Sequence, residues 1–186
     1  MSRRSADVVV VGGGIVGAAC AYECAAGGLS VMVIEESVVG GGATAAGMGH
    51  IVVMDDSEAQ FQLTSLSEKM WNERVGAMPA GVEHLPCGTL WVAADEEEMA
   101  EVRRKQAFYE ARGVPVEVLD RRQLEEAEPH LRKDMAGGLL VPGDSVVYPP
   151  VAVSWMLREC GATVVSGLGV ITLRDGGVTL SDGEVI

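Results

Sequence analysis

The residues best suited to chemistry in this chain are three glycines and one glutamate near its start. Gly12, Gly14 and Gly17 form a G-x-G-x-x-G pattern, and Glu35 follows eighteen residues after the third glycine. The first glycine permits a sharp turn, the second lets backbone approach a pyrophosphate, and the third allows a helix to pack closely on a strand. The glutamate carboxylate can accept hydrogen bonds from both ribose hydroxyls and would repel a 2′-phosphate, which disfavours NADP.

Three apolar segments are predicted to hold these residues in place. The valines of 8–11 indicate a buried strand, residues 15–26 have the periodicity of a helix, and 31–34 indicate a second strand that ends on Glu35. A diphosphate at the glycines would face the unpaired N–H groups of the helix N-terminus. A chain with 24 glycines could contain this pattern as a structural turn only. Both strands, the helix and the acid in the correct order favour the unit that binds the ADP half of a dinucleotide.

The glycine turn does not distinguish FAD from NAD, because both cofactors present the same ADP group. Three observations favour FAD. The unit begins at residue 7, the spacing of small residues continues through Ala21 and Gly28, and a second run of small residues, GGGATAAGMGH, occupies 40–50. Such a run lets backbone approach a long cofactor beyond its pyrophosphate.

At this point the chain resembles the D-amino acid oxidase-like FAD-dependent oxidoreductases, of the glycine oxidase, sarcosine oxidase and D-amino acid or hydroxyproline dehydrogenase type. The first 50 residues carry the most specific part of the resemblance. Later segments that resemble the family are RRQLEEAEPHL at 121–131, GGLLVPGDSVVYPPV at 137–151 and ATVVSGLGVITL at 162–173. The last of these looks like the family's strand pair next to the adenine side of FAD.

The pattern and the resemblance together imply a set of residues that contact FAD. They lie in the glycine turn, at the end of the second strand, in the second run of small residues, and near the adenine. These residues are Gly12, Gly14, Ile15, Val16, Gly17, Glu35, Glu36, Gly42, Ala43, Thr44, Ala46, Gly47, Met48 and Val170. The resemblance also implies hydride transfer to the flavin from the C–N bond of glycine, sarcosine, a D-amino acid, or proline and hydroxyproline.

His50 is the candidate catalytic residue, because a histidine can change charge near neutral pH and this one follows the segment expected along the flavin. An ordinary loop histidine is the alternative. His84 and His130 stand beside prolines in loop-like contexts, and no spacing of His, Cys and carboxylates predicts a metal site. Few acids or bases are needed, since a flavin carries the difficult chemistry itself.

The expected fold class is α/β, a Rossmann-like FAD-binding domain with part of an inserted α+β substrate domain. The first part of the FAD-binding domain is expected at 1–81, the partial substrate domain at 82–142, and the second part of the FAD-binding domain at 143–186. Helices are predicted at 57–78, at 95–112 and from Pro149 to Arg158, and strands at 89–93 and 114–119. Residues 178–186 are predicted to form a hairpin that turns at Asp182 and Gly183.

Members of the family that this chain resembles are roughly twice its length. The chain is therefore expected to be an N-terminal half, whose apolar sheet edge associates with itself or with a partner that supplies the second half. Two other readings stay open. One is a non-catalytic dinucleotide-binding fragment or subunit that needs a partner chain, and the other is an NAD-linked dehydrogenase.

The composition excludes several partners. The net charge of −13 argues against nucleic-acid binding, which requires clustered Lys and Arg. The apolar runs are too short to span a membrane, and the start of the chain has no recognisable cleavage site for secretion. The four cysteines are dispersed without a C-x-x-C, which fits a reducing, cytoplasmic setting.

Overall fold

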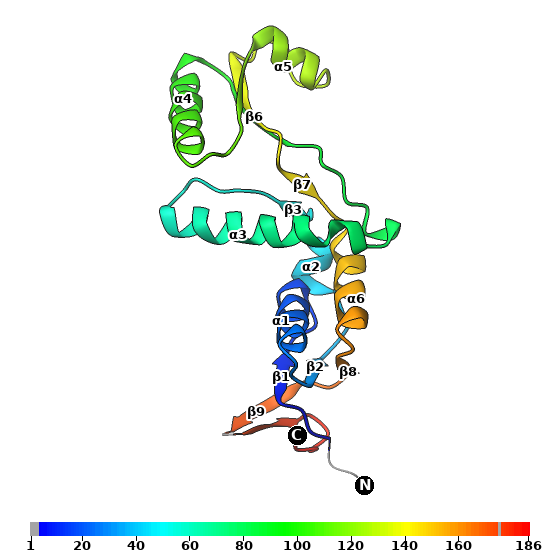
Figure 1. The fold of residues 1–186 in the computed structure, drawn as a ribbon. Helices are drawn as coiled ribbons and strands as arrows, with labels where there is room; N and C mark the ends of the chain where they lie inside the picture. Colours follow the sequence, from blue (N-terminus) through cyan, green and yellow to red (C-terminus); the bar gives the residue numbers. More distant parts are fainter. Residues whose placement is uncertain (1–3, 175) are drawn as a thin grey trace. The chain divides into compact units, whose positions relative to one another are not determined.

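A computed structural model describes residues 4–174 and 176–186. The chain divides into two compact units. Unit 1 comprises Met1–Gly49, Met78–Glu83 and Val147–Ile186, and unit 2 comprises His50–Ala77 and His84–Val146. Segments far apart in the sequence therefore combine in each unit, as the colours of Figure 1 show.

Unit 1 is built on a parallel sheet of three strands, β1 (Val8–Val11), β2 (Val31–Glu35) and β8 (Thr163–Ser166). Their order is β1-β2-β8, and both pairings are parallel. The central strand β2 is covered on both faces, since Val31 to Ile34 are all buried. Continuous apolar runs of this kind are typical of parallel strands. The strands predicted at 8–11 and 31–34 are thus confirmed.

Two helices cover one face of this sheet, α1 (Ile15–Ala26) and α6 (Pro149–Glu159). They lie side by side in Figure 1, and the rings of Tyr22 and Trp155 stack between them with their centroids 5.9 Å apart. Ala18 and Ala21 are fully buried on α1, because small side chains let the helix approach its neighbours closely. Prolines in the first turn of α6 are tolerated since those N–H groups have no intrahelical partner.

An antiparallel hairpin, β9 (Val170–Arg174) and β10 (Gly177–Leu180), packs against the opposite face of the sheet. Its residues Val178 and Leu180 share a buried core with Met32, Ile34 and Val165. Residues 162–173 were expected to form a strand pair, and this expectation is corrected, because the two strands are present but do not pair with each other. Strand β8 pairs with β2 and β9 pairs with β10, because β8 continues the parallel sheet that β1 and β2 begin.

The hairpin predicted at 178–186 is present as backbone hydrogen bonds. Val178 and Ile186 exchange N–H···O bonds of 2.9 and 3.0 Å, and the N–H of Leu180 donates to the carbonyl of Glu184 at 2.8 Å. Asp182 and Gly183 form the turn, where Gly183 has a φ of +90° that favours glycine.

Unit 2 contains an antiparallel sheet in the order β4-β6-β5. These strands are β4 (Thr89–Ala93), β5 (Glu117–Asp120) and β6 (Gly137–Val141), and they are accompanied by α4 (Glu96–Glu110) and α5 (Arg121–Ala127). Asp95 caps α4 through the N–H of Glu98, and Asp120 forms a capping box with Gln123 on α5. Strand β5 begins at Glu117 and not at residue 114, since the segment after α4 first turns back on that helix through a bond from Val114 N–H to the Tyr109 carbonyl.

The rest of unit 2 contains α3 (Glu58–Arg74) and the short pair β3 (His50–Ile51) and β7 (Ser145–Val146). Ser57 caps α3 by accepting from the N–H of Gln60. The helix predicted at 57–78 ends at Arg74 and continues only as a 3₁₀ turn, η1 (Val75–Ala77), and a second turn, η2 (Ala80–Val82), lies in unit 1. Among the described residues, no helix is long and apolar enough to cross a membrane.

Candidate functional site

The glycine turn of unit 1 has a geometry that only glycine allows at two positions. Gly12 has a φ of +101°, a left-handed conformation that side chains disfavour. A Cβ added to Gly17 would lie 2.0 Å from the carbonyl oxygen of Gly12. The helix therefore begins in direct contact with the turn that leaves β1.

Glu35, at the end of β2, is hydrogen-bonded to this turn. Its Oε2 accepts from the backbone N–H of Gly13 at 2.8 Å, and its Oε1 accepts from the N–H of Ser37 at 2.8 Å. A carboxylate has about four lone-pair sites, so acceptor capacity remains for ligand hydroxyls. The two backbone bonds fix the orientation of the acid beside the glycines.

A short helix, α2 (Gly42–Ala46), lies in the second run of small residues, which the sequence did not identify as helical. The buried hydroxyl of its Thr44 accepts from the N–H of Ile15 at 3.0 Å. Gly14 itself contributes no capping side chain to α1, and a Cβ added there would lie 3.0 Å from the Thr44 hydroxyl. Thr44 thus takes the place of a cap and joins the two glycine segments.

This arrangement can bind an anion. The N–H groups of Val16 and Gly17 belong to the first turn of α1, where no intrahelical carbonyl is available to them. The helix dipole adds partial positive charge at the same end. Among the described residues, α1 has no acid in its first turn. The bare glycine backbone next to it leaves room for a phosphate.

Glu36 and Val170 lie at the same end of the sheet. The side chain of Glu36 runs beside Gly169, where an added Cβ would lie 3.3 Å from its Cδ. Strand β9 begins at Val170, and the preceding loop is anchored by a bond of 2.9 Å from the N–H of Gly167 to the carbonyl of Glu35. The carboxyl ends of β2 and β8 thus lie next to each other at this end of the sheet, where ligands of open α/β sheets bind.

The remaining predicted contacts follow α2. Ala43 and Ala46 are exposed on the helix, Gly42 has a φ of +56°, Gly47 forms the C-cap, and Met48 is 76% exposed. Gly49 then packs so tightly that an added Cβ would lie 1.9 Å from the Val147 carbonyl. The Met48 side chain is therefore available to a ligand while the backbone after it is held in place.

His50 lies in unit 2, exposed on β3 and paired with Val146 of β7. It is near enough to Asp144 to affect that acid's ionisation. Asp144 is 1% exposed, and burial raises its pKa although hydrogen bonds from the Thr89 side chain and the Val53 N–H oppose the shift. Burial and the charge of Asp144 likewise raise the pKa of Glu68.

A second buried acid of unit 2, Asp55, is neutralised by two cations. Its oxygens lie 2.5 Å from Lys105 Nζ and 2.6 Å from Arg104 Nη2. Burial alone would raise the pKa of Asp55, but the hydrogen bonds from these cations outweigh it and lower the pKa below its ordinary value. Tyr109 adds bonds to Asp55 and to the Val53 carbonyl. Arg104, Lys105 and Tyr109 thus all bond to the Asp55 carboxylate, which indicates a role in the framework.

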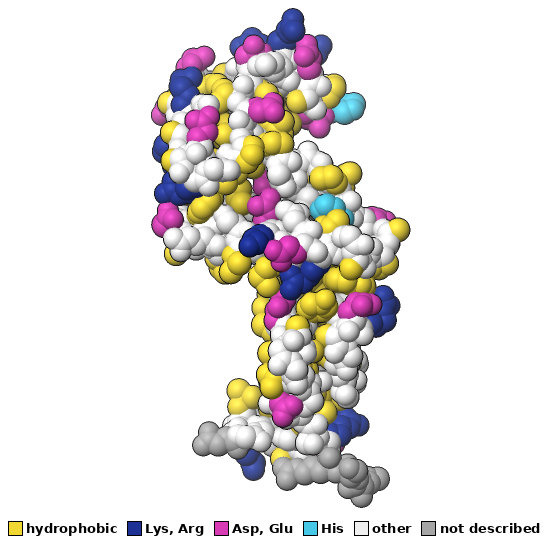
Figure 2. Space-filling model, viewed as in Figure 1, with side chains coloured by type: hydrophobic (Ala, Val, Ile, Leu, Met, Phe, Trp, Pro, Cys, Tyr) yellow, Lys and Arg dark blue, Asp and Glu magenta, His cyan; other side chains and the backbone are white. Residues whose placement is uncertain are grey.

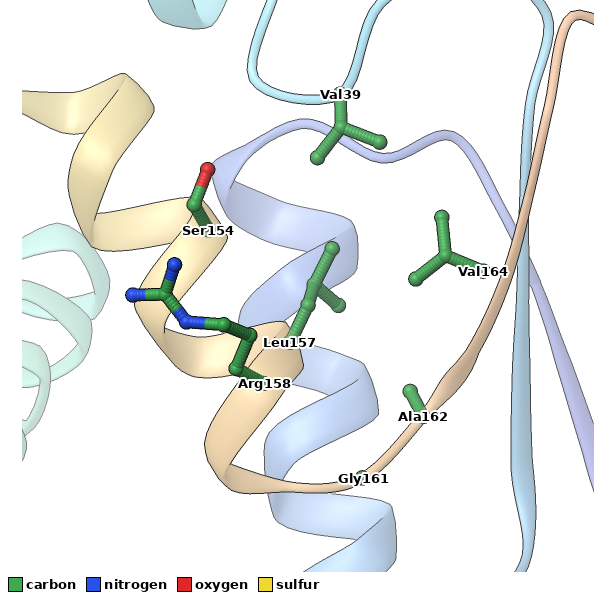
Figure 3. Close-up of a pocket in the computed structure, with 7 residues that line it drawn as sticks. All are labelled: Val39, Ser154, Leu157, Arg158, Gly161, Ala162 and Val164. Carbon is green, nitrogen blue, oxygen red and sulfur yellow. The ribbon is translucent and has the colours of Figure 1, made fainter.

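A hollow of about 360 Å³ lies between α6 and β8 (Figure 3). Leu157 and Val164 form apolar walls, while Arg158 and Ser154 supply polar atoms at its side. None of the predicted cofactor residues lines this hollow. Among the described residues, no group of three or more His, Cys, Asp and Glu side chains could hold a metal ion.

Sequence reasoning missed three residues whose backbone groups hold the site in place. Gly13 and Ser37 orient Glu35, and Gly40 donates its N–H to the Gly13 carbonyl at 2.8 Å. The only signal in the sequence was that Ser37 and Gly40 closely follow Glu35. Their pairing depends on how the loop folds back, which no spacing rule specifies.

The chain matches a known family over nearly its whole length. A sequence profile described as FAD dependent oxidoreductase matches residues 7–185. The glycine oxidase of Geobacillus kaustophilus (strain HTA426) is 29% identical over 183 residues, which cover 90% of this chain and 48% of that enzyme. The mitochondrial L-2-hydroxyglutarate dehydrogenase of Homo sapiens is 30% identical over 181 residues, covering 91% of this chain and 38% of that enzyme.

Solved structures have the same fold. The crystal structure of L-proline dehydrogenase from P. horikoshii matches with a TM-score of 0.88 at 25% identity. The match covers 100% of this chain and 51% of the dehydrogenase chain. That of glycine oxidase from Geobacillus kaustophilus has a TM-score of 0.86 at 26% identity, with coverages of 96% and 52%. The chain thus spans about half the length of these proteins.

Proposed function

The chain belongs to the FAD-dependent oxidoreductase family, and we propose that it supplies the FAD-binding part of an enzyme that oxidises the C–N bond of a small amino acid or secondary amine. The observation that carries this proposal is the bond between Glu35 and Gly13, which unites the acid and the glycine turn. The FAD cofactor itself follows from the family.

The residues present fit the cofactor. The cradle made by Gly12, Gly14 and Gly17 has no space for a Cβ at Gly17, as expected where the helix must start close to the strand. We infer that the first-turn N–H groups of Val16 and Gly17 face the diphosphate, while Ile15, whose N–H donates to Thr44, would contact the cofactor from the same turn. Glu35 would accept the ribose hydroxyls with its remaining lone pairs.

The other predicted contacts complete this proposal. Glu36 and Val170 would lie near the adenine of FAD, since they lie at the same end of the sheet as Glu35. The segment from α2 to Met48 would follow the cofactor beyond its diphosphate. These residues of the segment are Gly42, Ala43, Thr44, Ala46, Gly47 and Met48. Their small side chains suit close backbone approach.

When bound, FAD supplies the electron-pair acceptor for the hydride that leaves the substrate carbon. The chain's own part in the reaction is to bind and orient. Glycine, sarcosine, a D-amino acid, and proline or hydroxyproline are the proposed substrates, supported by the similarity to glycine oxidase and L-proline dehydrogenase. His50 is proposed as the catalytic residue, because it is exposed and follows the segment proposed to lie along the flavin.

Unit 1 is proposed as the cofactor domain and unit 2 as part of a substrate domain. A reducing, cytoplasmic setting is also proposed, since all four cysteines are free thiols. A partner segment or a second copy of the chain is proposed to complete the assembly, because matched relatives are about twice as long. The same fact supports the alternative of a dinucleotide-binding subunit that is inert by itself.

A visible absorption spectrum, recorded before and after denaturation, tests the proposal. A flavin band that is released on unfolding supports it, and a colourless protein with no affinity for added FAD contradicts it. Reduction of a dye by the assembled enzyme with glycine, sarcosine, D-alanine or proline then tests the substrate class. Activity on 2-hydroxy acids alone would favour the chemistry named for L-2-hydroxyglutarate dehydrogenase instead.

A further inference from the structure

Met48 is the one exposed methionine among the described residues. Its side chain is 76% exposed, whereas Met32, Met99 and Met156 are buried. The other methionines that the structure describes are partly buried, namely Met54, Met70, Met78 and Met135. A thioether is well suited to filling gaps in a core, so these methionines occupy ordinary positions for their type. Met48 is placed differently from all of them.

The backbone on both sides of Met48 is held by hydrogen bonds. Before it, the N–H of Gly47 donates to the carbonyl of Thr44 at 3.4 Å. After it, the carbonyl of Gly49 accepts from the N–H of Val147 at 2.9 Å, and Gly49 has a φ of +73° that favours glycine. Met48 and these two glycines form the whole connection between α2 and β3. The fold therefore holds this side chain in solvent at a fixed place.

The thioether gives Met48 a chemistry that its exposed apolar neighbours lack. Figure 2 shows hydrophobic side chains at the surface of unit 1, over the part where Figure 1 draws α1, and Val16 of that helix is 74% exposed. A hydrocarbon side chain is inert to hydrogen peroxide, whereas a thioether is converted to a sulfoxide. The sulfur lone pair attacks one peroxide oxygen, and the O–O bond breaks. That oxygen stays on sulfur and the other leaves with both protons as water, so methionine loses an electron pair and peroxide gains it.

We propose that Met48 is a reversible oxidation site, at which hydrogen peroxide forms a sulfoxide that weakens the binding of FAD. The inference rests on the proposed function, in which the segment from α2 to Met48 follows the cofactor. A sulfoxide is polar and carries an added oxygen, and the held glycines on either side restrict how far the backbone can move aside. Thr44 also bonds the N–H of Ile15 at 3.0 Å, so a displaced segment disturbs the start of α1 as well.

The same placement makes the modification depend on the cofactor. Bound FAD would cover Met48 and slow its oxidation, whereas the empty chain presents the sulfur to solvent. Oxidation would therefore act on chains that have lost FAD and hinder their reloading. Methionine sulfoxide reductases would reverse the change, since each sulfoxide epimer has its own reductase.

The test treats the unaltered chain with hydrogen peroxide and locates each sulfoxide by peptide mass spectrometry. We expect Met48 to be oxidised about tenfold faster than the other described methionines, because its sulfur is the exposed one. Saturating FAD should slow the reaction at Met48 and leave the rates at the buried methionines unchanged. After treatment, titration with FAD should give a dissociation constant that is raised about fivefold or more, because the apolar thioether has become polar.

The controls separate the sulfoxide from oxidised thiols. Cys20 and Cys87 are exposed and also react with peroxide. Dithiothreitol reduces disulfides and sulfenic acids, so alone it should not restore FAD binding, whereas the two methionine sulfoxide reductases should. Met48→Leu should bind FAD equally well before and after peroxide. Met70→Leu, at a partly buried methionine of α3, should lose as much affinity as the unaltered chain.

Three results would overturn the proposal. They are oxidation of Met48 no faster than that of the other described methionines, full recovery of FAD binding with dithiothreitol alone, and unchanged FAD binding after complete oxidation of Met48. A chain that binds no FAD before treatment rejects the proposed cofactor function, while the peptide map still decides whether Met48 is the oxidation site. A chain that binds FAD but forms no sulfoxide at Met48 rejects the oxidation site alone.

Discussion

The carboxylate of Glu35 accepts a hydrogen bond from the backbone N–H of Gly13 over 2.8 Å, although 22 residues separate them in the chain. The end of β2 thereby fixes the turn that ends β1. Ribose recognition and diphosphate recognition are consequently coupled, because a change in the acid disturbs the glycine turn as well as the sugar contact.

Glu35→Ala should weaken FAD binding by about tenfold to a hundredfold. The change removes charged hydrogen bonds, which contribute about 1.5–3 kcal/mol each. Isothermal titration with FAD and with ADP measures the loss, and ADP should lose as much as FAD because the ribose belongs to both. Glu159→Gln, at an exposed acid of α6, is the control. Equal affinities of Glu35→Ala and the unaltered chain would exclude Glu35 as the ribose acceptor.

Gly17→Ala should abolish FAD binding and lower the stability of unit 1. A Cβ there would lie 2.0 Å from the Gly12 carbonyl oxygen, a backbone atom that can move only if the turn rearranges. Gly76→Ala is the matched control, since a Cβ at that residue meets nothing within 4 Å. The measurements are flavin content and thermal unfolding. Normal flavin content in Gly17→Ala would contradict the assigned cradle.

The sequence predicted the part of this site that depends on local rules. The strand at Val8–Val11, the helix at Ile15–Ala26 and the acid at position 35 follow from apolar periodicity and glycine geometry, and all three are present. Thr44 as a cap for Ile15 could not be predicted, because 29 residues of chain separate the two groups. The separate pairing of strands β8 and β9 could not be predicted for the same reason, since apolar runs specify strands but not their partners.

Asp55→Ala should destabilise unit 2 by about 3 kcal/mol, the lower end of the range for breaking a buried ion pair. The substitution leaves Lys105, whose side chain is 12% exposed, without its carboxylate, while the more exposed Arg104 keeps its bonds to Glu101. Denaturant unfolding measures the loss. Glu73→Ala breaks an exposed pair with Lys69 and should have no measurable effect. Equal effects of the two variants would contradict the structural role of Asp55.

The stabilisation by Asp55 should also depend on pH. Its pKa is lower in the folded chain than in the unfolded chain, so the contribution is complete above the ordinary carboxyl pKa of about 3.9 and is lost as pH falls through the folded value. The difference in unfolding free energy between the unaltered chain and Asp55→Ala should therefore decrease below about pH 4. A difference that stays constant down to pH 2 would show that charge does not carry it.

Asp144 should give the opposite pH dependence. Burial raises its pKa, so the folded chain holds this proton more tightly than the unfolded chain does, and this group should add stability to unit 2 as pH falls through the folded pKa toward the ordinary carboxyl value of about 3.9. Glu68 acts in the same direction, since burial and the Asp144 charge raise its pKa too. Asp144→Asn keeps an oxygen that can accept from the Val53 N–H but cannot ionise. The contribution of this proton to the unfolding free energy between pH 7.5 and about 4 should therefore be missing in Asp144→Asn, whereas Asp56→Asn, at an exposed acid, should retain all of it. An equal change in unfolding free energy over this pH range in Asp144→Asn and in the unaltered chain would contradict a raised pKa of Asp144.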